Sequence, residues 1–535
     1  MGGACSCGST TQATSTRSPS PLFLMSWHRL LSGQGVLPAV VAGALWALAF
    51  PPFGLFLLVF AFLTPLLASV RNTRARKAFR NGWLTGATFA LVNFFWVAQF
   101  VSKWTGSWPL GMTPWILMAA AFGVYIGLFA VAASALMGRG LWWLVPIAWA
   151  GVEVVRSVIP YLFFPWSVTA SALATMPVLV QPAWWGGTYL LGAWVTFGSV
   201  LLLAFLSARG EEPLAPNARV VGRVAVLWAA VPVLGIWSST LPLEGREVRL
   251  VALQTGVNMA FGPDGRPTNR QAINQGLAHT VPPLLRQARN AEIAVLPEGI
   301  VQAVRDRPPD LPFAYDGVPP LVTGGVREVG NVAYQALFTY DGKWQYADKT
   351  RLVIFGEYVP FREHLPFLDA YQLPSGDLTP GTGIRTLSVN GVRVGGLLCF
   401  EGLFEEVART HLENGARVLA LLTVDDWYQG TGAIEHLVQT AILRAAENRI
   451  PLVRASPLGP SLVVDSRGRV LSRVPKGQPG VAFASVVLEE STVFPLRKVA
   501  PAISVGVLSF GLILAFWRDL GRKRQEPASN EGLGT

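Results

Sequence analysis

Residues 220–254 read VVGRVAVLWAAVPVLGIWSSTLPLEGREVRLVALQ, and this stretch contains two different kinds of structure. Residues 220–240 form an apolar run of the length that crosses a bilayer as a helix, about 20 residues. After Leu241 and Pro242 the pattern changes, and Val248 to Gln254 has the short β-branched and apolar pattern of a strand. The chain therefore passes from a membrane helix into a water-facing domain at about residue 242.

The run at 220–240 is one of eight apolar segments that we predict to be membrane helices. They are residues 34–51, 53–69, 82–101, 113–137, 140–159, 183–206, 220–240 and 499–517. The first two are joined by the turn Pro51-Pro52-Phe53-Gly54, so they are alternatively one kinked or re-entrant element. Composition supports a membrane protein, because 51% of the 535 residues are hydrophobic and only 14% are charged.

Basic residues gather in the loops and tails of the apolar region. Within residues 245–498 the basic and acidic residues nearly balance, so almost all of the net charge of +11 lies elsewhere. This distribution orients a membrane protein and argues against a nucleic-acid surface. The basic clusters are Arg71, Arg74, Arg76, Lys77 and Arg80; Arg209, Arg219 and Arg223; and Arg518, Arg522, Lys523 and Arg524. With both termini in the cytoplasm and eight crossings, every cluster falls inside and residues 242–498 lie outside.

The outer segment alternates short apolar runs with amphipathic stretches, which predicts a layered α/β sandwich large enough for its own core. Predicted strands are 248–254, 293–296, 321–323, 332–339, 343–347, 394–399, 418–423, 451–455 and 461–465, and predicted helices are 268–287, 403–414 and 433–448. The predicted organisation is an N-terminal tail (1–33) expected to be disordered, a part with about seven helices (34–241), the α/β domain (242–498), a last helix (499–517) and a cytoplasmic tail (518–535).

Cys399 is the one cysteine of the structured body, since Cys5 and Cys7 lie in the Ser/Thr-rich tail. The opening MGGACS fits a myristoylation pattern, which we interpret as accidental in a chain with many spans, and translation alternatively begins at Met25. Cys399 ends a predicted strand and precedes an amphipathic helix. Backbone N–H groups of that turn and the helix dipole favour a thiolate and suit a developing oxyanion. The alternative is an inert buried cysteine. No Cys or His cluster indicates a metal.

Two further segments carry charged residues that bear on the role of the thiol. Glu298 directly follows an apolar strand and Pro297, where a carboxylate is placed to act as a general base. Lys349 follows a hairpin strand, and Glu357 lies in the next loop. Taken singly, each is alternatively a solvated surface charge. Glu153 and Arg156, three residues apart in an apolar segment, are interpreted as a structural ion pair.

Local sequence around these residues resembles the nitrilase (carbon-nitrogen hydrolase) superfamily. The motifs are Leu296-Pro297-Glu298-Gly299, Asp348-Lys349 followed by Phe355-Gly356-Glu357-Tyr358-Val359-Pro360, and Leu398-Cys399-Phe400-Glu401. One branch joins such a domain to several membrane helices, the apolipoprotein N-acyltransferase family. The helical part resembles it too, in the stretches Gly43 to Gly54, Arg76 to Gly86 and Phe164-Pro165-Trp166. The resemblance extends from about residue 36 to the C-terminus.

The resemblance implies a multi-span α-helical membrane domain of about eight helices plus an extracytoplasmic nitrilase-like αββα sandwich. It implies that Cys399 is the nucleophile, Glu298 the general base and Lys349 the group that stabilises the tetrahedral oxyanion. Glu357 and Glu401 match supporting acidic positions, and the backbone N–H of Phe400 is a further candidate for the oxyanion.

The implied activity is transfer of an acyl chain from a phospholipid, through a thioester, to the N-terminal amine of diacylglyceryl-cysteine in apolipoproteins. Such covalent catalysis needs neither metal nor cofactor. The implied location is the bacterial cytoplasmic (inner) membrane with the α/β domain in the periplasm, and we expect a monomer.

This chain departs from the family pattern at several positions. Phe400 stands where Tyr is common after the nucleophile, Leu296 where Trp usually precedes Pro-Glu, and Ile354 where Pro usually precedes Phe-Gly-Glu. After Gln254 to Asn258 the usual Trp is missing, and the nearest aromatic residue is Phe261. These changes bear on donor or acceptor choice.

Three other functions are compatible with parts of the sequence. The same chemistry with water as acceptor gives a membrane-anchored amidase or esterase, and the lipid-embedded helices argue against a small polar substrate. An inactive relative that binds lipoproteins is a second alternative, although all three triad residues are present. A transporter is disfavoured because the spans show no inverted repeat.

Overall fold

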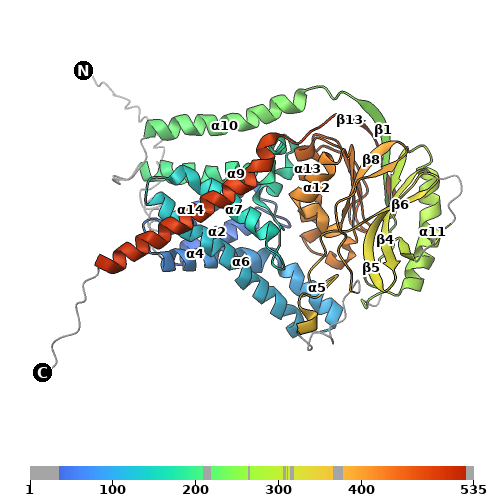
Figure 1. The fold of residues 1–535 in the computed structure, drawn as a ribbon, viewed down its shortest axis with the longest axis horizontal. Helices are drawn as coiled ribbons and strands as arrows, with labels where there is room; N and C mark the ends of the chain where they lie inside the picture. Colours follow the sequence, from blue (N-terminus) through green and yellow to red (C-terminus); the bar gives the residue numbers. More distant parts are fainter. Residues whose placement is uncertain are drawn as a thin grey trace, which may run out of the picture.

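The computed structural model describes residues 35–208, 218–262, 265–304, 309, 311–313, 319–364 and 377–525. A helical region and an α/β domain lie side by side along the long axis of the molecule (Figure 1). The predicted N-terminal tail with Cys5, Cys7 and Met25 lies outside the described residues, as do Arg209 and residues 526–535 of the C-terminal tail.

Apolar helical segments occupy all eight predicted positions. The helical region contains α2 (Leu37–Leu48), η1 (Phe56–Phe60), α3 (Leu63–Val70), α4 (Ala75–Asn93), α5 (Phe95–Thr105), α6 (Trp108–Met137), η2 (Trp142–Leu144), α7 (Val145–Val158), η3 (Thr169–Thr175), α8 (Pro177–Val180), α9 (Ala183–Ala208), α10 (Ala218–Thr240) and α14 (Pro495–Gln525). Among the described residues four of these, α6, α9, α10 and α14, are long and apolar enough to cross a membrane, or five if the bent pair α4 and α5 is one span.

Three predicted spans differ in shape from the expectation. The segment 82–101 is divided between α4 and α5, which are bent by 50° at Phe94. No proline or glycine marks this bend, so the apolar pattern does not reveal it. The segments before and after Pro51-Pro52 form only short helices, α2 and η1–α3, because consecutive prolines lack the N–H groups that continue a helix.

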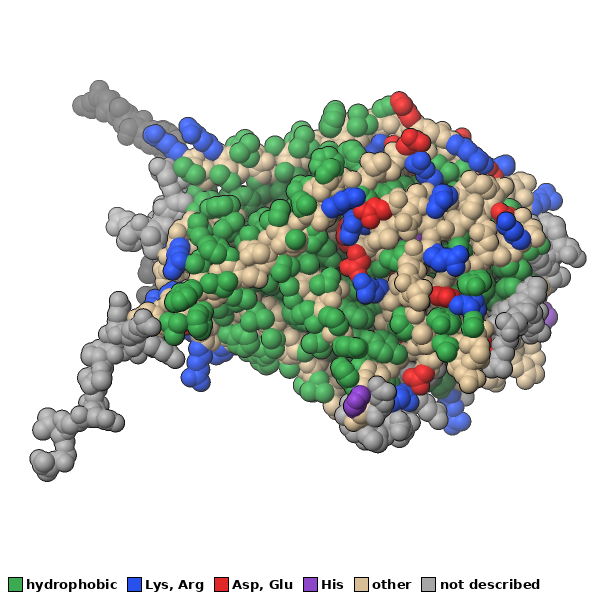
Figure 2. Space-filling view, viewed as in Figure 1, with side chains coloured by type: hydrophobic (Ala, Val, Ile, Leu, Met, Phe, Trp, Pro, Cys, Tyr) green, Lys and Arg blue, Asp and Glu red, His purple; other side chains and the backbone are tan. Residues whose placement is uncertain are grey.

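The basic clusters share one end of the helical region. Arg71 donates a hydrogen bond to Ser207 Oγ at 3.1 Å, which joins the end of α3 to the end of α9. The backbone N–H of Ala75 donates to Asp519 at 3.1 Å, which joins α4 to the end of α14. Figure 2 shows Lys and Arg side chains gathered at this end, separated from the α/β domain by a broad apolar surface. This arrangement agrees with the predicted positive-inside pattern.

The α/β domain is an αββα sandwich, as predicted. One sheet has the order β13-β1-β2-β4-β5-β6 with β3 on β4, and the other has the order β12-β11-β10-β9-β8-β7. The strands are β1 (Arg246–Gln254), β2 (Ile293–Val295), β3 (Val301–Val304), β4 (Leu321–Val329), β5 (Val332–Tyr340), β6 (Trp344–Asp348), β7 (Leu387–Val389), β8 (Val392–Leu398), β9 (Val418–Leu422), β10 (Leu452–Ala455), β11 (Leu462–Val464), β12 (Val470–Arg473) and β13 (Gly480–Leu488). Buried apolar residues from both sheets form the core between them.

Helices cover the outer faces of the two sheets (Figure 1). They are α11 (Arg270–Gln287) on the first sheet, and α12 (Glu405–Glu413) and α13 (Ala433–Asn448) between the second sheet and the helical region, with the short turns η4 (Arg362–His364), η6 (Cys399–Leu403) and η7 (Asp425–Tyr428). All three predicted helices are therefore confirmed. The nine predicted strands are confirmed too, while β3, β7, β12 and β13 were not predicted.

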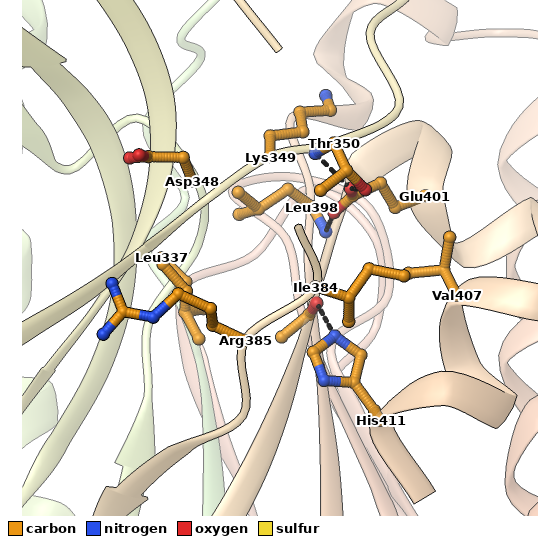
Figure 3. Close-up of a pocket in the computed structure, with 12 residues that line it drawn as sticks. Leu337, Asp348, Lys349, Thr350, Ile384, Arg385, Leu398, Glu401, Val407 and His411 are labelled. Carbon is orange, nitrogen blue, oxygen red and sulfur yellow. Dashed lines mark hydrogen bonds between the residues drawn. The ribbon is translucent and has the colours of Figure 1, made fainter. Parts of the chain in front are cut away.

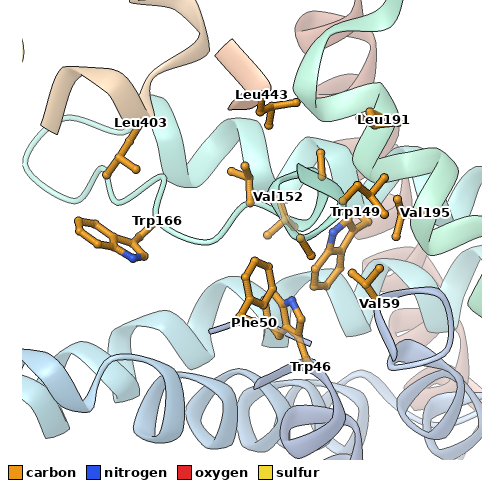
Figure 4. Packing of buried hydrophobic residues seen from close by; sticks show 14 of the residues in the cluster. Trp46, Phe50, Val59, Trp149, Val152, Trp166, Leu191, Val195, Leu403 and Leu443 are labelled. Carbon is orange, nitrogen blue, oxygen red and sulfur yellow. The ribbon is translucent and has the colours of Figure 1, made fainter. Parts of the chain in front are cut away.

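One apolar core runs through the helical region and into the α/β domain. Trp46 stacks on Phe89 with ring centroids 3.7 Å apart, and its ring edge meets Trp149. The same cluster contains Leu403 and Leu443 of the α/β domain (Figure 4). The sandwich is thus packed onto the apolar helices, which fixes its orientation relative to them.

Buried polar contacts reinforce this junction. Arg497, at the start of α14, donates to Glu405 at 2.7 Å and to the backbone carbonyl of Glu447 at 2.6 Å. His436 Nε2 lies 3.0 Å from the Pro51 carbonyl, which can only accept, so Nδ1 accepts from Ser167 Oγ at 2.8 Å. Both networks join segments of the helical region to the α/β domain.

The ion pair predicted between Glu153 and Arg156 is present and structural. The two side chains are buried and 3.4 Å apart. Arg156 also donates to the carbonyls of Phe164 and Trp166, at 2.9 and 2.7 Å. It therefore holds the loop that connects α7 to η3.

Candidate active site

Cys399 lies at a strained turn at the end of a central strand. It directly follows β8, which is parallel to β9, and it begins η6. Its φ of 50° is in the left-handed region, which a non-glycine residue adopts at an energetic cost. The thiol is half-buried, and Thr423 Oγ1, from the end of β9, lies 3.5 Å from Sγ. The turn therefore places the thiol at the C-terminal ends of two parallel strands, β8 and β9.

Glu298 lies at the end of β2, in the sheet that faces β8. The residue is 5% exposed, and Gln335 Nε2 donates to Oε1 at 2.9 Å. Burial raises the pKa of this carboxyl to about 7, an effect that Lys349 opposes and Glu357 adds to. At neutral pH the group exchanges a proton readily, which is what a general base requires.

Lys349 follows β6, and its side chain is completely buried. Nζ lies 2.6 Å from Glu357 Oε1 and 3.9 Å from Glu298 Oε1. Burial by itself lowers the pKa of this ammonium group, but the carboxylates of Glu357 and Glu298 outweigh it and raise the pKa overall. Lys349 is therefore a permanent positive charge beside the base.

Glu357 and Glu401 have different structural roles. Glu357 Oε2 accepts from the backbone N–H of Val353 at 2.9 Å while Oε1 holds Lys349, so it fixes the position of the ammonium group. Glu401 accepts from the backbone N–H groups of Thr350 and Leu398, at 2.7 and 3.1 Å. Figure 3 shows these two bonds converging on Glu401, while Lys349 points away from that carboxylate.

Glu401 therefore ties the segment that carries Lys349 to the strand that carries Cys399. It accepts from Arg351 N–H as well, at 3.1 Å. Burial raises the pKa of Glu401, and Lys349 and the backbone donors oppose that rise. The small pocket beside Lys349 is lined by both residues and by His411, whose Nε2 lies 2.9 Å from the Gly396 carbonyl.

The expectation that the turn favours a thiolate is wrong. Burial, followed by the negative charge of Glu298, raises the pKa of Cys399 to about 11, and Lys349 only partly opposes this. The η6 turn is a single short 3-10 element, so the dipole that a longer helix would supply is small. The resting thiol is consequently protonated and needs a base.

The structure thus gathers all three predicted triad residues at one site. The charges of Glu298 and Lys349 both act on the pKa of Cys399. Phe400, whose N–H was predicted to help hold the oxyanion, directly follows Cys399, and its ring packs 6.2 Å from Phe163 of the helical region. The oxyanion role of that N–H stays a prediction. Within the described part of the chain, no three His, Cys, Asp or Glu side chains come together as a metal site.

Two residues of the site were not predicted from the sequence. Gln335 accepts the Lys349 N–H on its backbone carbonyl at 2.8 Å and donates to Glu298 from its side chain, so it positions both charged groups. Thr423 contacts the thiol and also donates to Asp425. The sequence does contain a signal for Gln335, because it is a polar residue within a mostly apolar predicted strand.

Aromatic side chains line the boundary between the site and the helices. Tyr428 of η7 meets Trp96 of α5 at 4.9 Å and Trp166 at 5.8 Å between ring centroids. Burial raises the pKa of Tyr428 well above its ordinary value. Trp427 packs on Phe261, near the position where the family's usual Trp is missing.

Comparison with known proteins agrees with both halves of this architecture. A family model described as apolipoprotein N-acyltransferase N-terminal domain matches residues 42–201, and one described as carbon-nitrogen hydrolase matches residues 319–495. The apolipoprotein N-acyltransferase of Geobacter metallireducens is 28% identical over 517 residues, which cover 89% of this chain and 95% of that protein. The one of Gloeobacter violaceus is 29% identical over 500 residues, covering 88% and 91%.

Among solved structures, Saccharomyces cerevisiae Nit3, a member of the nitrilase superfamily, is similar to this chain at a TM-score of 0.33 with 15% identity, covering 54% of this chain and 97% of its own. The full-length relatives and the two domain matches, in the same order along the chain, place this protein in the apolipoprotein N-acyltransferase family.

Proposed function

We propose that this protein moves an acyl chain from a phospholipid, through a thioester on Cys399, to the N-terminal amine of diacylglyceryl-cysteine in apolipoproteins. It acts as a multi-pass protein of the bacterial inner membrane, as a monomer, with the α/β domain in the periplasm. The observation that carries the proposal is the packing of the catalytic turn on the apolar helices, where Phe163 contacts Phe400 next to the thiol. A site in that position receives lipid substrates directly from the bilayer.

The first half-reaction forms the thioester. Glu298 takes the proton of the Cys399 thiol, and Sγ attacks the ester carbonyl of the phospholipid. Lys349, and the Phe400 N–H, stabilise the negative oxygen of the tetrahedral intermediate. When the intermediate collapses, the C–O bond breaks, and the lysophospholipid alkoxide takes the proton from Glu298.

The second half-reaction uses the same groups, and Glu298 again acts first as a base and then as an acid. The amine of diacylglyceryl-cysteine attacks the thioester carbonyl and forms a second oxyanion beside Lys349. Glu298 takes a proton from the attacking nitrogen. The C–S bond then breaks, an amide is formed, and Sγ is reprotonated by Glu298.

Mass spectrometry of the intact protein tests the proposal. Incubation with phospholipid should add the mass of one acyl chain to the full-length protein, and Cys399→Ala should show no addition. A diacylglyceryl-cysteine peptide should then remove the acyl chain and gain an amide. Release of free fatty acid in place of the acylated peptide would instead indicate the hydrolase alternative, and no adduct under any condition would indicate an inactive relative.

A further inference from the structure

A pocket separate from the catalytic site lies beside the end of α10. Its apolar lining consists of Met176, Pro177 and Val178, and its polar lining consists of Thr175, Gln181, Ser239, Arg467 and Arg469. Neither the proposed reaction nor the family resemblance uses any of these residues.

The sheet topology places this pocket far from Cys399. Strands β8, β9 and β10 are parallel, and Cys399 follows the C-terminal end of β8. Strand β11 is antiparallel to β10, with Val464 opposite Leu452 at the start of β10. The turn after β11, which carries Arg467 and Arg469, therefore lies at the opposite end of the sheet from the thiol.

Two buried side chains of the pocket have unused hydrogen-bonding groups. Arg467 is 6% exposed; its Nη2 donates to Glu489 at 3.0 Å, whereas Nε has no partner among the described residues. Gln181 Nε2 donates to the carbonyls of Pro177 and Arg467, at 2.8 and 2.6 Å, which fixes the orientation of the amide. Its Oε1 is left without a donor in the described part of the chain. Buried polar groups of this kind usually have partners, so their absence indicates a ligand or water.

The turn that carries the arginines is held in a fixed conformation. Asp465 Oδ1 accepts the backbone N–H groups of Arg467 and Arg469, at 2.8 Å each. Arg469 is exposed, and its Nη2 donates to the Ser239 carbonyl at 2.8 Å, in the last turn of α10. Two guanidinium groups therefore meet at the point where an apolar helix enters the α/β domain.

The side of the pocket opposite the arginines is apolar and adjoins the exposed apolar surface of α10. Met176 is 43% exposed, and on α10 Val233, Ile236 and Trp237 are 60%, 53% and 57% exposed. The apolar surface along α10 is visible in Figure 2. In a membrane this surface contacts lipid tails, so the mouth of the pocket lies at the level of the lipid headgroups.

We propose that this pocket binds the headgroup phosphate of a membrane phospholipid as a second, non-catalytic lipid site. Arg467 and Arg469 bind the phosphate, for which the planar guanidinium is well suited. Gln181 Oε1 accepts from a headgroup hydroxyl or ammonium. One acyl chain lies on Met176 and the last turns of α10. A lipid held here joins α10, which is otherwise exposed, to the α/β domain.

Native mass spectrometry of the full-length Cys399→Ala protein tests this site without interference from acyl transfer. The protein in detergent is titrated with palmitoyl-oleoyl phosphatidylethanolamine, and the number of retained lipids is compared with that for palmitoyl-oleoyl glycerol and for inorganic phosphate. We expect one tightly retained phospholipid that Arg469→Gln weakens about tenfold, the effect of losing one charge-assisted hydrogen bond. Met176→Trp, which fills the apolar side and leaves both arginines in place, should weaken it similarly.

The matched control is Arg473→Gln on neighbouring β12, an arginine that pairs with Glu435 and lies outside the pocket. It should retain the lipid like the parent protein. Equal retention by the parent, Arg469→Gln and Met176→Trp would overturn the proposal. So would equal retention of the phosphate-free glycerolipid. Binding of inorganic phosphate with no phospholipid retained at this pocket would also overturn it.

Discussion

Lys349 Nζ lies 2.6 Å from Glu357 Oε1 but 3.9 Å from Glu298 Oε1. The ammonium group is therefore anchored by one carboxylate and stands beside the other, the proposed base. An anchored positive charge needs no reorganisation when negative charge develops on a substrate oxygen, which is the property of an oxyanion-stabilising group.

We predict that Lys349→Ala slows both half-reactions, each by about 100-fold to 1,000-fold, because each passes through a tetrahedral oxyanion. Thioester formation is followed by intact mass, and transfer is followed by supplying a preformed thioester and an amine acceptor. If the preformed thioester reacts with the amine at the wild-type rate, Lys349 has no role in deacylation and is a structural partner of Glu357.

We predict that Cys399→Ala abolishes acyl-enzyme formation without unfolding the protein, and that Cys399→Ser does so too. The half-buried thiol contributes few packing contacts, so its loss should change the free energy of unfolding little. Thermal unfolding in detergent checks stability, and intact mass checks acylation. Wild-type transfer by either variant would contradict the mechanism.

The sequence predicts the central residues of the site because each follows an element that local patterns reveal. Glu298 and Cys399 end apolar strands, and Lys349 follows a hairpin strand. Only the family resemblance predicts supporting roles for Glu357 and Glu401. It does not indicate that Glu357 binds the Lys349 ammonium group while Glu401 binds backbone N–H groups. Gln335 was missed because its role depends on two strands meeting in space.

The unpredicted parts of the fold depend on long-range contacts. The pairing of β13 with β1 sets Leu488 opposite Arg246, at the two ends of the domain's sequence. No local pattern reveals such a pairing. The local pattern around Cys399 predicts a thiolate, whereas burial of the thiol and the Glu298 carboxylate, which comes from a distant segment, raise the thiol pKa.

A topology experiment tests the predicted orientation. Reporters fused after Leu241 or within Gly265 to Thr268 should be periplasmic, and one after Arg524 should be cytoplasmic. The reason is that the basic clusters at one end of the helices should face the cytoplasm. Alkaline phosphatase and green fluorescent protein fusions at each position give opposite signals for the two sides. A cytoplasmic signal from the Gly265 fusion would overturn the assignment.

We predict that Arg497→Ala strongly destabilises the junction between the two regions. Arg497 is buried and pairs with buried Glu405, so its loss leaves an uncompensated carboxylate, at a cost of about 3 to 5 kcal/mol. The midpoint of thermal unfolding in detergent should fall by at least about 5 °C. Arg473→Ala removes a more exposed arginine paired with Glu435 and serves as the control, with little change expected. Equal midpoints for the two variants would show that the Arg497 network does not stabilise the junction.

The final prediction concerns the protonation state of Glu298. Its pKa is raised to about 7, so the carboxylate that accepts the thiol proton predominates above that pH and is lost below it. The rate of thioester formation in the wild-type protein should therefore fall about tenfold for each pH unit below 7, and should level off above it. Glu298→Gln keeps the shape and the contact with Gln335 but has no carboxylate, so it should form no thioester at any pH in this range. Because the Cys399 thiol has its pKa raised to about 11, hydroxide in solution deprotonates little of it at pH 8. Stopped incubations with phospholipid between pH 5.5 and 8.5, analysed by intact mass, measure both proteins. A flat profile for the wild-type protein, or a thioester in Glu298→Gln, would show that another group takes the proton.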